Sequence, residues 1–521
     1  MSVCLACVAL SCFPGAAELF FDDFSRFPPG LLSRPMGQLN GAIQEYHYIE
    51  HRGVRTHPWR NPIVHLDSWA ASDEDGKPYL EQHLVNDMPG RTTPLFVTGD
   101  EEWSDYAVEV SVKPLSLAEL AGVVFRYRTS RHYYLFALRG GSEAVLLVRQ
   151  PIEKELRKAE WKTIATAPHR YDTRQYLRLR VENTGPRIRA LIDGRAVLEA
   201  ADGEILKGET GVMANVPARF QDFAVTASDD AAKGIRQRIA SREAEEAALR
   251  AGNPQPRLWK TFVTPGFGAG RNVRFGDLDG DGRPEMLIAQ NIPRVRGDAF
   301  DHISCLTAVT LDGKVLWQLG RPDPRNGLLT NDTPFQIHDL DGDGRNEVIL
   351  VRDFQLQVLE GATGKVRQRN WMPGMSREMK ERPYEINNGD SIAIFNLSGG
   401  KTAQEIVVKD RYQTFWVFDR DLQVRWSGQG QTGHYPFPLD FDGDGREEFV
   451  IGYTLWSHAQ KPVWTNDKTL LDHADGISAG RFTADANAPP RVYICGSDEG
   501  FLMFDHQGRI LKHVRLGHAQ T

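Results

Sequence analysis

The sequence is poor in cysteine. Five cysteines occur in 521 residues, and three of them, Cys4, Cys7 and Cys12, lie close to the N-terminus. The other two, Cys305 and Cys495, are far apart in the chain. We therefore expect two free, buried thiols, and we exclude a disulfide framework and a cysteine-based metal site.

Long apolar runs and an excess of basic residues are also missing. After the N-terminal segment no apolar run reaches about 18 residues, so no membrane span is predicted. The 62 Lys and Arg residues face 69 Asp and Glu residues, a net charge of −7. This balance excludes the basic surface of a nucleic-acid-binding protein. The composition is that of a soluble globular protein, and the length indicates two or three domains.

The N-terminal segment "MSVCLACVALSCFPGAAELFF" has an apolar stretch at 3–13 and small residues at 15–17. This pattern predicts a secretory signal peptide over residues 1–17, and hence a secreted or periplasmic protein. The usual positive charges at the start are lacking. A lipoprotein anchor at Cys12 is the alternative, although "ALSC" matches such a site poorly.

Residues 18–228 show the two-residue periodicity of β-strands. Alternating segments recur with turn signals between them, among them "YAVEVSVKPL" (106–115), "YYLFALRG" (133–140) and "YLRLRVENTG" (176–185). Strands with one buried side are typical of antiparallel sheets packed face to face. The sequence therefore predicts an N-terminal β-sandwich of the jelly-roll type.

Residues 229–256 break this pattern. Ala, Glu and Arg dominate residues 229–252, and "GNPQP" follows them. This composition predicts a charged helix of about five turns. We interpret the segment as a helical linker between two β domains.

A repeat occupies residues 257–521. Its unit is complete at 334–369, where "PFQIHDL", "EVILVR", "LQVLEG" and "KVRQR" are separated by turns. Four strands at this period predict the blade of a β-propeller. We count five blades, and "GHAQT" (517–521) echoes "DHADG" (472–476). This echo favours a chain that stops inside its propeller over a complete five-bladed ring with a short tail.

Three of the repeats carry an acidic loop of the form D-x-D-G-D-G-x-x-E. Carboxylates from a tight, glycine-containing turn are the hard oxygen ligands that Ca²⁺ prefers. The corresponding loops of the third and fifth repeats have lost most carboxylates and should bind no metal. The sequence thus predicts up to three structural Ca²⁺ ions, with these ligands: Asp277, Asp279, Asp281 and Glu285; Asp339, Asp341, Asp343 and Glu347; Asp440, Asp442, Asp444 and Glu448.

The acidic loops resemble the calcium loops of FG-GAP propeller repeats. With "GDLDGDGRPEMLIAQN" and "DHADG", residues 260–521 are also similar to propeller polysaccharide lyases of the rhamnogalacturonan lyase kind. Separately, "AGVVFRYR" (121–128) and "GETGVMANVPARFQDFAV" (208–225) resemble concanavalin A-like sandwiches such as laminin-G modules. These resemblances imply a glycan as the partner. The sandwich lacks the E-x-D-x-x-E strand of a family-16 glucanase, so we expect it to bind glycan or only to pack.

Chemistry is expected on the propeller face opposite the acidic turns. Residues that open the inner strands, and residues between the second and third strands, meet there around the channel mouth. The catalytic candidates are His434, His473, Tyr412 and Tyr435, and the substrate-binding candidates are Asn331, Arg352, Asn388, Lys409, Arg411 and Trp456.

This set of side chains fits β-elimination from a uronate polymer. Arg352, Lys409 and Arg411 would neutralise the C6 carboxylate and so make the C5 proton acidic. His434 or His473 would take that proton. Tyr412 or Tyr435 would protonate the departing O4, and Trp456 would stack on a sugar ring. The predicted function is a polysaccharide lyase for an acidic glycan that contains rhamnose and uronate.

Two other functions stay open. The first is a non-catalytic glycan-binding or adhesion protein with a calcium-stabilised propeller. The second is a glycoside hydrolase, for which Asp390 and Asp475 would be the paired carboxylates. We prefer elimination because bases and cations outnumber well-placed acids. In each case we expect a monomer.

Overall fold

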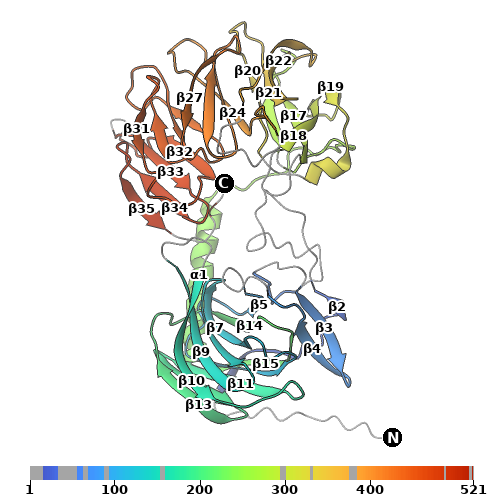
Figure 1. Ribbon diagram of the computed structural model, residues 1–521, viewed down its shortest axis with the longest axis vertical. Coiled ribbons are helices and arrows are strands. Elements are labelled where there is room, and N and C mark those ends of the chain that lie inside the picture. The colour runs from blue at the N-terminus through green and yellow to red at the C-terminus, as the bar shows by residue number, and fades with distance from the viewer. Residues whose placement is uncertain are drawn as a thin grey trace. The chain divides into compact units, whose positions relative to one another are not determined.

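The computed structural model of the chain describes residues 16–32, 56–62, 68–86, 93–152, 159–270, 272–293, 301–328, 332–374, 384–485, 488–514 and 519. These residues fall into two units that divide between Arg257 and Leu258 (Figure 1). Most of the predicted signal peptide, and the candidate Asn331, lie outside the described residues. Both therefore stay predictions.

The first sheet of the N-terminal unit has the strand order β13-β12-β11-β6-β15-β4-β3-β2, and β1 pairs with β15. All of the pairings are antiparallel. The strands are β1 (Ala16–Asp22), β2 (Gly30–Leu31), β3 (Trp69–Glu74), β4 (Lys77–Gln82), β6 (Tyr106–Pro114), β11 (Leu177–Thr184), β12 (Arg187–Ile192), β13 (Arg195–Ala201) and β15 (Ala218–Ser228).

The second sheet of this unit has the order β10-β9-β8-β7-β14-β5, again antiparallel throughout. Its strands are β5 (Leu95–Thr98), β7 (Ala121–Thr129), β8 (His132–Arg139), β9 (Glu143–Pro151), β10 (Ala159–Pro168) and β14 (Glu209–Ala214). Two sheets stacked in this way form the predicted sandwich.

Alternation along the strands explains the core between the two sheets. In β11, Leu177, Leu179 and Val181 are buried, while the residues between them are half-buried on the other face. In β8, Tyr134 and Phe136 join this core, whereas Tyr133 and Leu135 belong to a second apolar cluster on the outer face of the second sheet. Because both faces of β8 are buried, its sequence is a continuous apolar run.

The predicted helix is α1 (Asp229–Gly252). The side chain of Ser228 accepts a hydrogen bond from the backbone N–H of Ala231 and so caps the first turn. Ala232 and Ile235 are buried in the core of the sandwich. The first half of the helix is therefore packed on the N-terminal unit, with contacts to β1 and β15.

The C-terminal unit consists of five four-stranded antiparallel sheets in chain order, which are propeller-like blades (Figure 1). Their strands are β16 (Val273–Gly276), β17 (Glu285–Pro293), β18 (Asp301–Val309) and β19 (Val315–Gly320); β20 (Phe335–His338), β21 (Glu347–Arg352), β22 (Gln355–Glu360) and β23 (Val366–Trp371); β24 (Ser391–Phe395), β25 (Glu405–Lys409), β26 (Thr414–Phe418) and β27 (Val424–Gln429); β28 (Phe437–Leu439), β29 (Glu448–Ile451), β30 (Thr454–Trp456) and β31 (Pro462–Thr465); β32 (Gly476–Gly480), β33 (Arg491–Cys495), β34 (Phe501–Phe504) and β35 (Ile510–Val514).

The first strand of each blade lies next to the first strand of a neighbouring blade. β16 contacts β20, β20 contacts β24, and β28 contacts β32. The acidic turns lead from the first strand to the second, so they share one face of the unit. The predicted all-β fold, a sandwich followed by a propeller with a charged helix between them, is confirmed.

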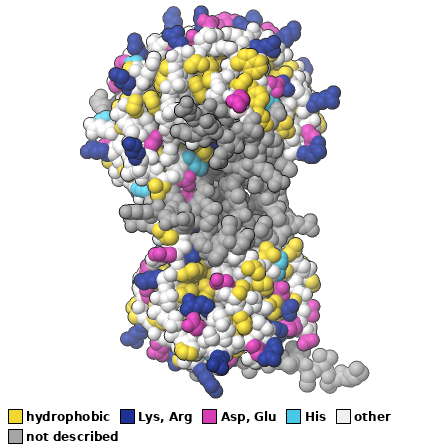
Figure 2. All heavy atoms as spheres, viewed as in Figure 1, with side chains coloured by type: hydrophobic (Ala, Val, Ile, Leu, Met, Phe, Trp, Pro, Cys, Tyr) yellow, Lys and Arg dark blue, Asp and Glu magenta, His cyan; other side chains and the backbone are white. Residues whose placement is uncertain are grey.

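Two other expectations can be compared with the described residues. Cys305 and Cys495 are free, as predicted, although only Cys305 is fully buried. No helix in the described ranges is long and apolar enough to cross a membrane. Lys and Arg side chains alternate with Asp and Glu on the visible surface, without a patch of one sign (Figure 2).

The sandwich offers a test of its close strand packing at Gly211 in β14, which pairs with both β5 and β7. A Cβ atom there would lie 2.2 Å from the carbonyl oxygen of Phe96 and 2.8 Å from the Cα of Val97. We expect Gly211→Ala to destabilise the sandwich by about 1–3 kcal/mol through overpacking. The melting temperature, followed by calorimetry, reports the effect.

Gly203→Ala is the matched control, because the nearest atom to its added Cβ is 3.7 Å away. Equal melting temperatures for the two variants would show that strand spacing near Gly211 relaxes without cost.

Candidate functional site

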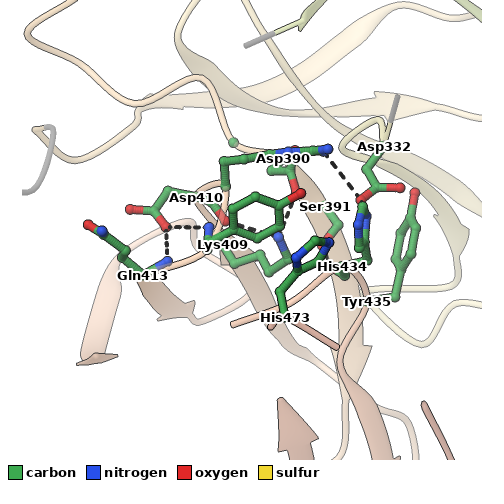
Figure 3. A network of polar contacts seen from close by, with 12 residues as sticks. Asp332, Asp390, Ser391, Lys409, Asp410, Gln413, His434, Tyr435 and His473 are labelled. Atoms are coloured by element: carbon green, nitrogen blue, oxygen red, sulfur yellow. Dashed lines mark hydrogen bonds and ion pairs between the residues drawn. The ribbon is translucent and has the colours of Figure 1, made fainter. Parts of the chain in front are cut away.

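A network of charged side chains lies where the blades open, on the face opposite the acidic turns (Figure 3). Asp332, Asp390, His434 and Asp475 all come shortly before the first strand of a blade, in the second to the fifth blade respectively. Lys409 ends β25, and Arg411 lies in the turn that follows it. The equivalent place in successive repeats thus supplies one charged side chain after another.

Two cations at the centre of this network are paired with carboxylates. The Nζ atom of Lys409 lies 2.6 Å from Oδ2 of Asp390, and Arg411 lies 2.9 Å from Oδ1 of the same residue. Arg411 also lies 3.5 Å from Asp332. Lys409 is 0% exposed and Arg411 is 2% exposed. Burial at this level requires such pairing, because an unpaired buried charge is strongly destabilising.

The two candidate histidines share one carboxylate. His434 Nε2 lies 2.9 Å from Oδ1 of Asp475, and His473 Nε2 lies 3.3 Å from the same atom. The Nδ1 atoms contact a second acid each, Asp332 for His434 and, at 2.8 Å, Asp472 for His473. The imidazole rings lie side by side, 5.2 Å between centroids (Figure 3).

These carboxylates decide the protonation of the histidines. Burial alone would lower the pKa of His473, but its hydrogen bonds to Asp472 and Asp475 raise that pKa to about 9. The pKa of His434 is also raised, because Asp332 and Asp475 outweigh its burial. Burial would raise the pKa of Asp332, yet attraction to His434 and Arg411 holds it below its usual value. In this arrangement the imidazole of His473 is in its charged form, with a proton on each nitrogen, at neutral pH.

The two candidate tyrosines lie differently. The ring of Tyr412 is 4.5 Å from that of His473 and 5.8 Å from that of His434. The guanidinium of Arg411 lies 4.9 Å from the centre of the same ring, a cation–π distance. The hydroxyl oxygen of Tyr435, in contrast, accepts a hydrogen bond from Arg274 at 3.2 Å. Tyr412 therefore belongs to the network. Tyr435 lies next to the network and connects it to Arg274 of the first blade.

The remaining substrate-binding candidates lie around the network. Asn388 is buried and lies 3.4 Å from Nδ1 of His302. Arg352 ends β21 and donates to the carbonyl oxygen of Ile303.

Trp456 is the exception, because it pairs with Phe449 next to Glu448 of the third acidic loop and packs against Phe415 and Trp426 of the neighbouring blade. Its stacking on a sugar stays a prediction.

The sequence analysis did not predict that several aspartates pair with the cations and histidines of the network. It considered Asp390 and Asp475 only as hydrolase residues and gave no role to Asp332 or Asp472. The first-strand repeat places Asp332, Asp390 and Asp475 at equivalent positions, so that signal was available. The contact between His302 and Asn388 had no such signal, because His302 opens the third strand of the first blade.

Each of the three acidic loops brings three of its four predicted ligands together. The fourth, Asp281, Asp343 or Asp444, accepts a hydrogen bond from the backbone N–H two residues later. In the first loop, Asp277 accepts hydrogen bonds from the backbone N–H groups of Gly280 and Gly282, and both glycines have a φ of +83°. The carboxylate oxygens within each loop lie within 4.8 Å of one another, in the groups Asp277, Asp279 and Glu285; Asp339, Asp341 and Glu347; Asp440, Asp442 and Glu448.

The charge of these loops is compensated to different degrees. Burial and the neighbouring aspartates raise the pKa of Glu285, and no described basic side chain forms an ion pair with the first loop. In the second loop Arg367 contacts Asp341 at 2.8 Å and Glu347 at 2.6 Å. In the third, His458 lies 3.0 Å from Glu448. Converging, undercompensated oxygen ligands fit Ca²⁺, and they fit it best in the first loop.

A fourth group that could hold a metal lies in the network itself. His434, His473 and Asp475 present two imidazole nitrogens and one carboxylate oxygen within 4.8 Å of one another. Such a mixed donor set suits a first-row transition metal better than Ca²⁺. In the structure, Nε2 of both rings lies against Oδ1 of Asp475 instead.

No protein-family model matches the chain. Two curated proteins of Bacillus subtilis are similar to it in sequence. They are the rhamnogalacturonan exolyase YesX, 26% identical over 256 residues, and the rhamnogalacturonan endolyase YesW, 25% identical over 256 residues. Each match covers 39% of this chain, and it covers 41% of YesX and 40% of YesW. The chain thus matches about two fifths of these relatives, and the similarity is distant.

Solved structures give weaker likenesses. The match to the crystal structure of YesW covers 87% of this chain and 69% of the YesW chain, with 15% identity and a TM-score of 0.38. The match to a rhamnogalacturonan lyase of Bacillus licheniformis covers 78% of this chain and 71% of the lyase chain, with 16% identity and a TM-score of 0.38. The carbohydrate-binding module CBM66 of Bacillus subtilis covers 32% of this chain and 94% of its own, with 16% identity and a TM-score of 0.26.

Calcium removal tests the acidic loops. The folded loops hold the ion and the unfolded chain does not, so bound Ca²⁺ stabilises the propeller by mass action. We expect excess chelator to lower the melting temperature of the C-terminal unit and to leave that of the sandwich unchanged. Calorimetry of the full chain resolves the two transitions.

Asp279→Ala should reproduce this loss in part, and Asp312→Ala is its control. Asp312 is an acidic side chain of the same blade, 77% exposed and outside the loop. If chelator changes neither transition, the loops are acidic turns without a bound ion.

Proposed function

We propose that this protein is a polysaccharide lyase that cleaves an acidic glycan containing rhamnose and uronate by β-elimination at the mouth of its propeller. The observation that carries the proposal is the sequence similarity to two rhamnogalacturonan lyases. The charged network at the blade openings supports it, because elimination needs proton transfer and neutralisation of a carboxylate at one place.

His473 and Tyr412 are the proposed proton-transfer pair. The side chain of His473 is 19% exposed, whereas that of His434 is 5% exposed, so substrate reaches His473 more easily. The ring of Tyr412 lies against that of His473 at 4.5 Å. Because His473 is charged at neutral pH, it would donate the proton to the departing O4, and Tyr412 would take the C5 proton. His434, which shares Asp475 with His473, would hold the imidazole of His473 in place.

Lys409 and Arg411 are proposed to hold other residues in place and not to bind the substrate. Both are buried and share Asp390, so neither is available as a lone charge for a uronate. Their pairing fixes the turn that carries Tyr412. The carboxylate of the substrate would be neutralised by more exposed cations, of which Arg352 is the sequence candidate.

A non-catalytic glycan-binding protein is the second candidate. The observation in its favour is the near-complete pairing of the central charges, which would be expected of a purely structural network. In either case we propose a secreted or periplasmic, monomeric protein with structural Ca²⁺.

Product formation separates the two functions. Elimination leaves an unsaturated uronate that absorbs in the ultraviolet, so we expect absorbance to rise when the protein is mixed with rhamnogalacturonan. His473→Ala and Tyr412→Phe should each lower kcat by about 10²–10⁴-fold, as removal of a proton-transfer group does. Tyr412→Phe should melt close to the wild type, because it keeps the aromatic ring and its packing. His473→Ala should melt lower, because it removes an imidazole that compensates the buried Asp475.

His506→Ala is the matched control, since His506 is an exposed histidine in the turn between β34 and β35. Full activity in both site variants, with lowered melting temperatures, would assign His473 and Tyr412 to structure alone. Binding without any unsaturated product would favour the non-catalytic function.

A further inference from the structure

A second polar feature lies beside the network, between the first two blades. It is a pocket of about 510 Å³ at the ends of β17, β18 and β21 and in the loop after β19. Its walls include Ile292, His302, Ser304, Arg321, Asn326 and Arg352. These strand ends belong to the same face of the propeller as the network.

Two aspartates, Asp323 and Asp353, line the pocket together with the two arginines. Asp323 is paired with Arg325 at 2.5 Å and Asp353 with His302 at 3.0 Å, so they compensate the pocket arginines only in part.

Arg321 is exposed, and none of the described residues forms an ion pair or a hydrogen bond with its side chain. Arg352 is 22% exposed in its side chain, and its nearest carboxylate, on Asp353, is 3.8 Å away. This contrasts with Arg411 in the network, which is buried and paired at 2.9 Å. Available guanidinium groups are the side chains that best recognise a carboxylate.

A tight turn borders the pocket between β21 and β22. Its two central residues, Asp353 and Phe354, have φ angles of 53° and 62°, as a two-residue hairpin of type I′ requires. The turn directs Phe354 against His302 at 6.3 Å and against Tyr384 at 5.4 Å between ring centroids. Aromatic rings beside polar groups are suited to the apolar face of a sugar ring.

His302 connects the pocket to the network. Its Nε2 atom lies 3.0 Å from Asp353, and its Nδ1 atom lies 3.4 Å from Oδ1 of Asn388. Asn388 comes two residues before Asp390, the carboxylate that holds Lys409 and Arg411. A chain of sugars that enters the mouth would therefore pass from one feature to the other.

We propose that this pocket is a subsite for a uronate unit of the glycan, with Arg321 and Arg352 binding its carboxylate and Phe354 packing beside its ring. The choice of a uronate as the ligand class rests on the proposed lyase function. The subsite itself is a binding site, and it is measured without turnover.

The test uses a tetrasaccharide of alternating rhamnose and galacturonate, and its methyl-esterified form, as probes for isothermal titration with the full chain. We expect Arg321→Gln and Arg352→Gln each to weaken binding of the acid form about tenfold, the loss of one charge-assisted contact. Esterification should weaken wild-type binding similarly and leave no further effect of the variants. In turnover, Arg321→Gln should raise KM with kcat nearly unchanged.

Arg420→Gln is the matched control. Arg420 is an exposed arginine in the turn between β26 and β27, and it does not line the pocket. Equal affinity of the wild type and Arg321→Gln, or equal affinity for the acid and ester probes, would overturn the subsite. Failure of the lyase function gives a different result, in which the acid probe binds through Arg321 and yields no unsaturated product.

Discussion

The propeller depends on the balance of buried charge where its blades open. Asp332, Asp390 and Asp475 come from three different blades, and each is nearly inaccessible to water. Charges in such a place must be compensated within the protein, because the loss of hydration costs more than a loose contact returns. Lys409, Arg411 and two imidazoles supply the compensation, so blades two to five are joined by ion pairs across their openings.

The opposite face of the same unit handles negative charge in another way. Its acidic turns are exposed and gather carboxylates around backbone N–H groups, a geometry that leaves room for a hard cation. Arg367 and His458 partly fill this role in the second and third loops. One face is thus stabilised by internal ion pairs, whereas the other presents carboxylate clusters that could hold a cation.

Much of this architecture could be predicted from the sequence, because repetition carries it. Equivalent positions in successive repeats predicted four-stranded blades, the three acidic turns, and His434 and His473 at neighbouring openings. Features that do not recur from repeat to repeat could not be predicted. The shared carboxylate of Asp475 depends on how two blades meet, and the pocket around Arg321 is built from a loop with no counterpart in the other repeats. Trp456 was expected between the second and third strands of its blade, but it lies inside the third strand, β30, and packs with Phe415.

The pairing of the central charges limits how a polyanion could be bound. A glycan with one carboxylate on every second sugar needs cations that are accessible, and Lys409 and Arg411 are neither exposed nor unpaired. Moving either toward a substrate would leave Asp390 as an uncompensated buried charge, at a cost of several kcal/mol. Attraction for the substrate must therefore come from guanidinium groups outside the network. Arg321 and Arg352 meet this requirement on the same face, so the network is left to hold the proton-transfer groups in place.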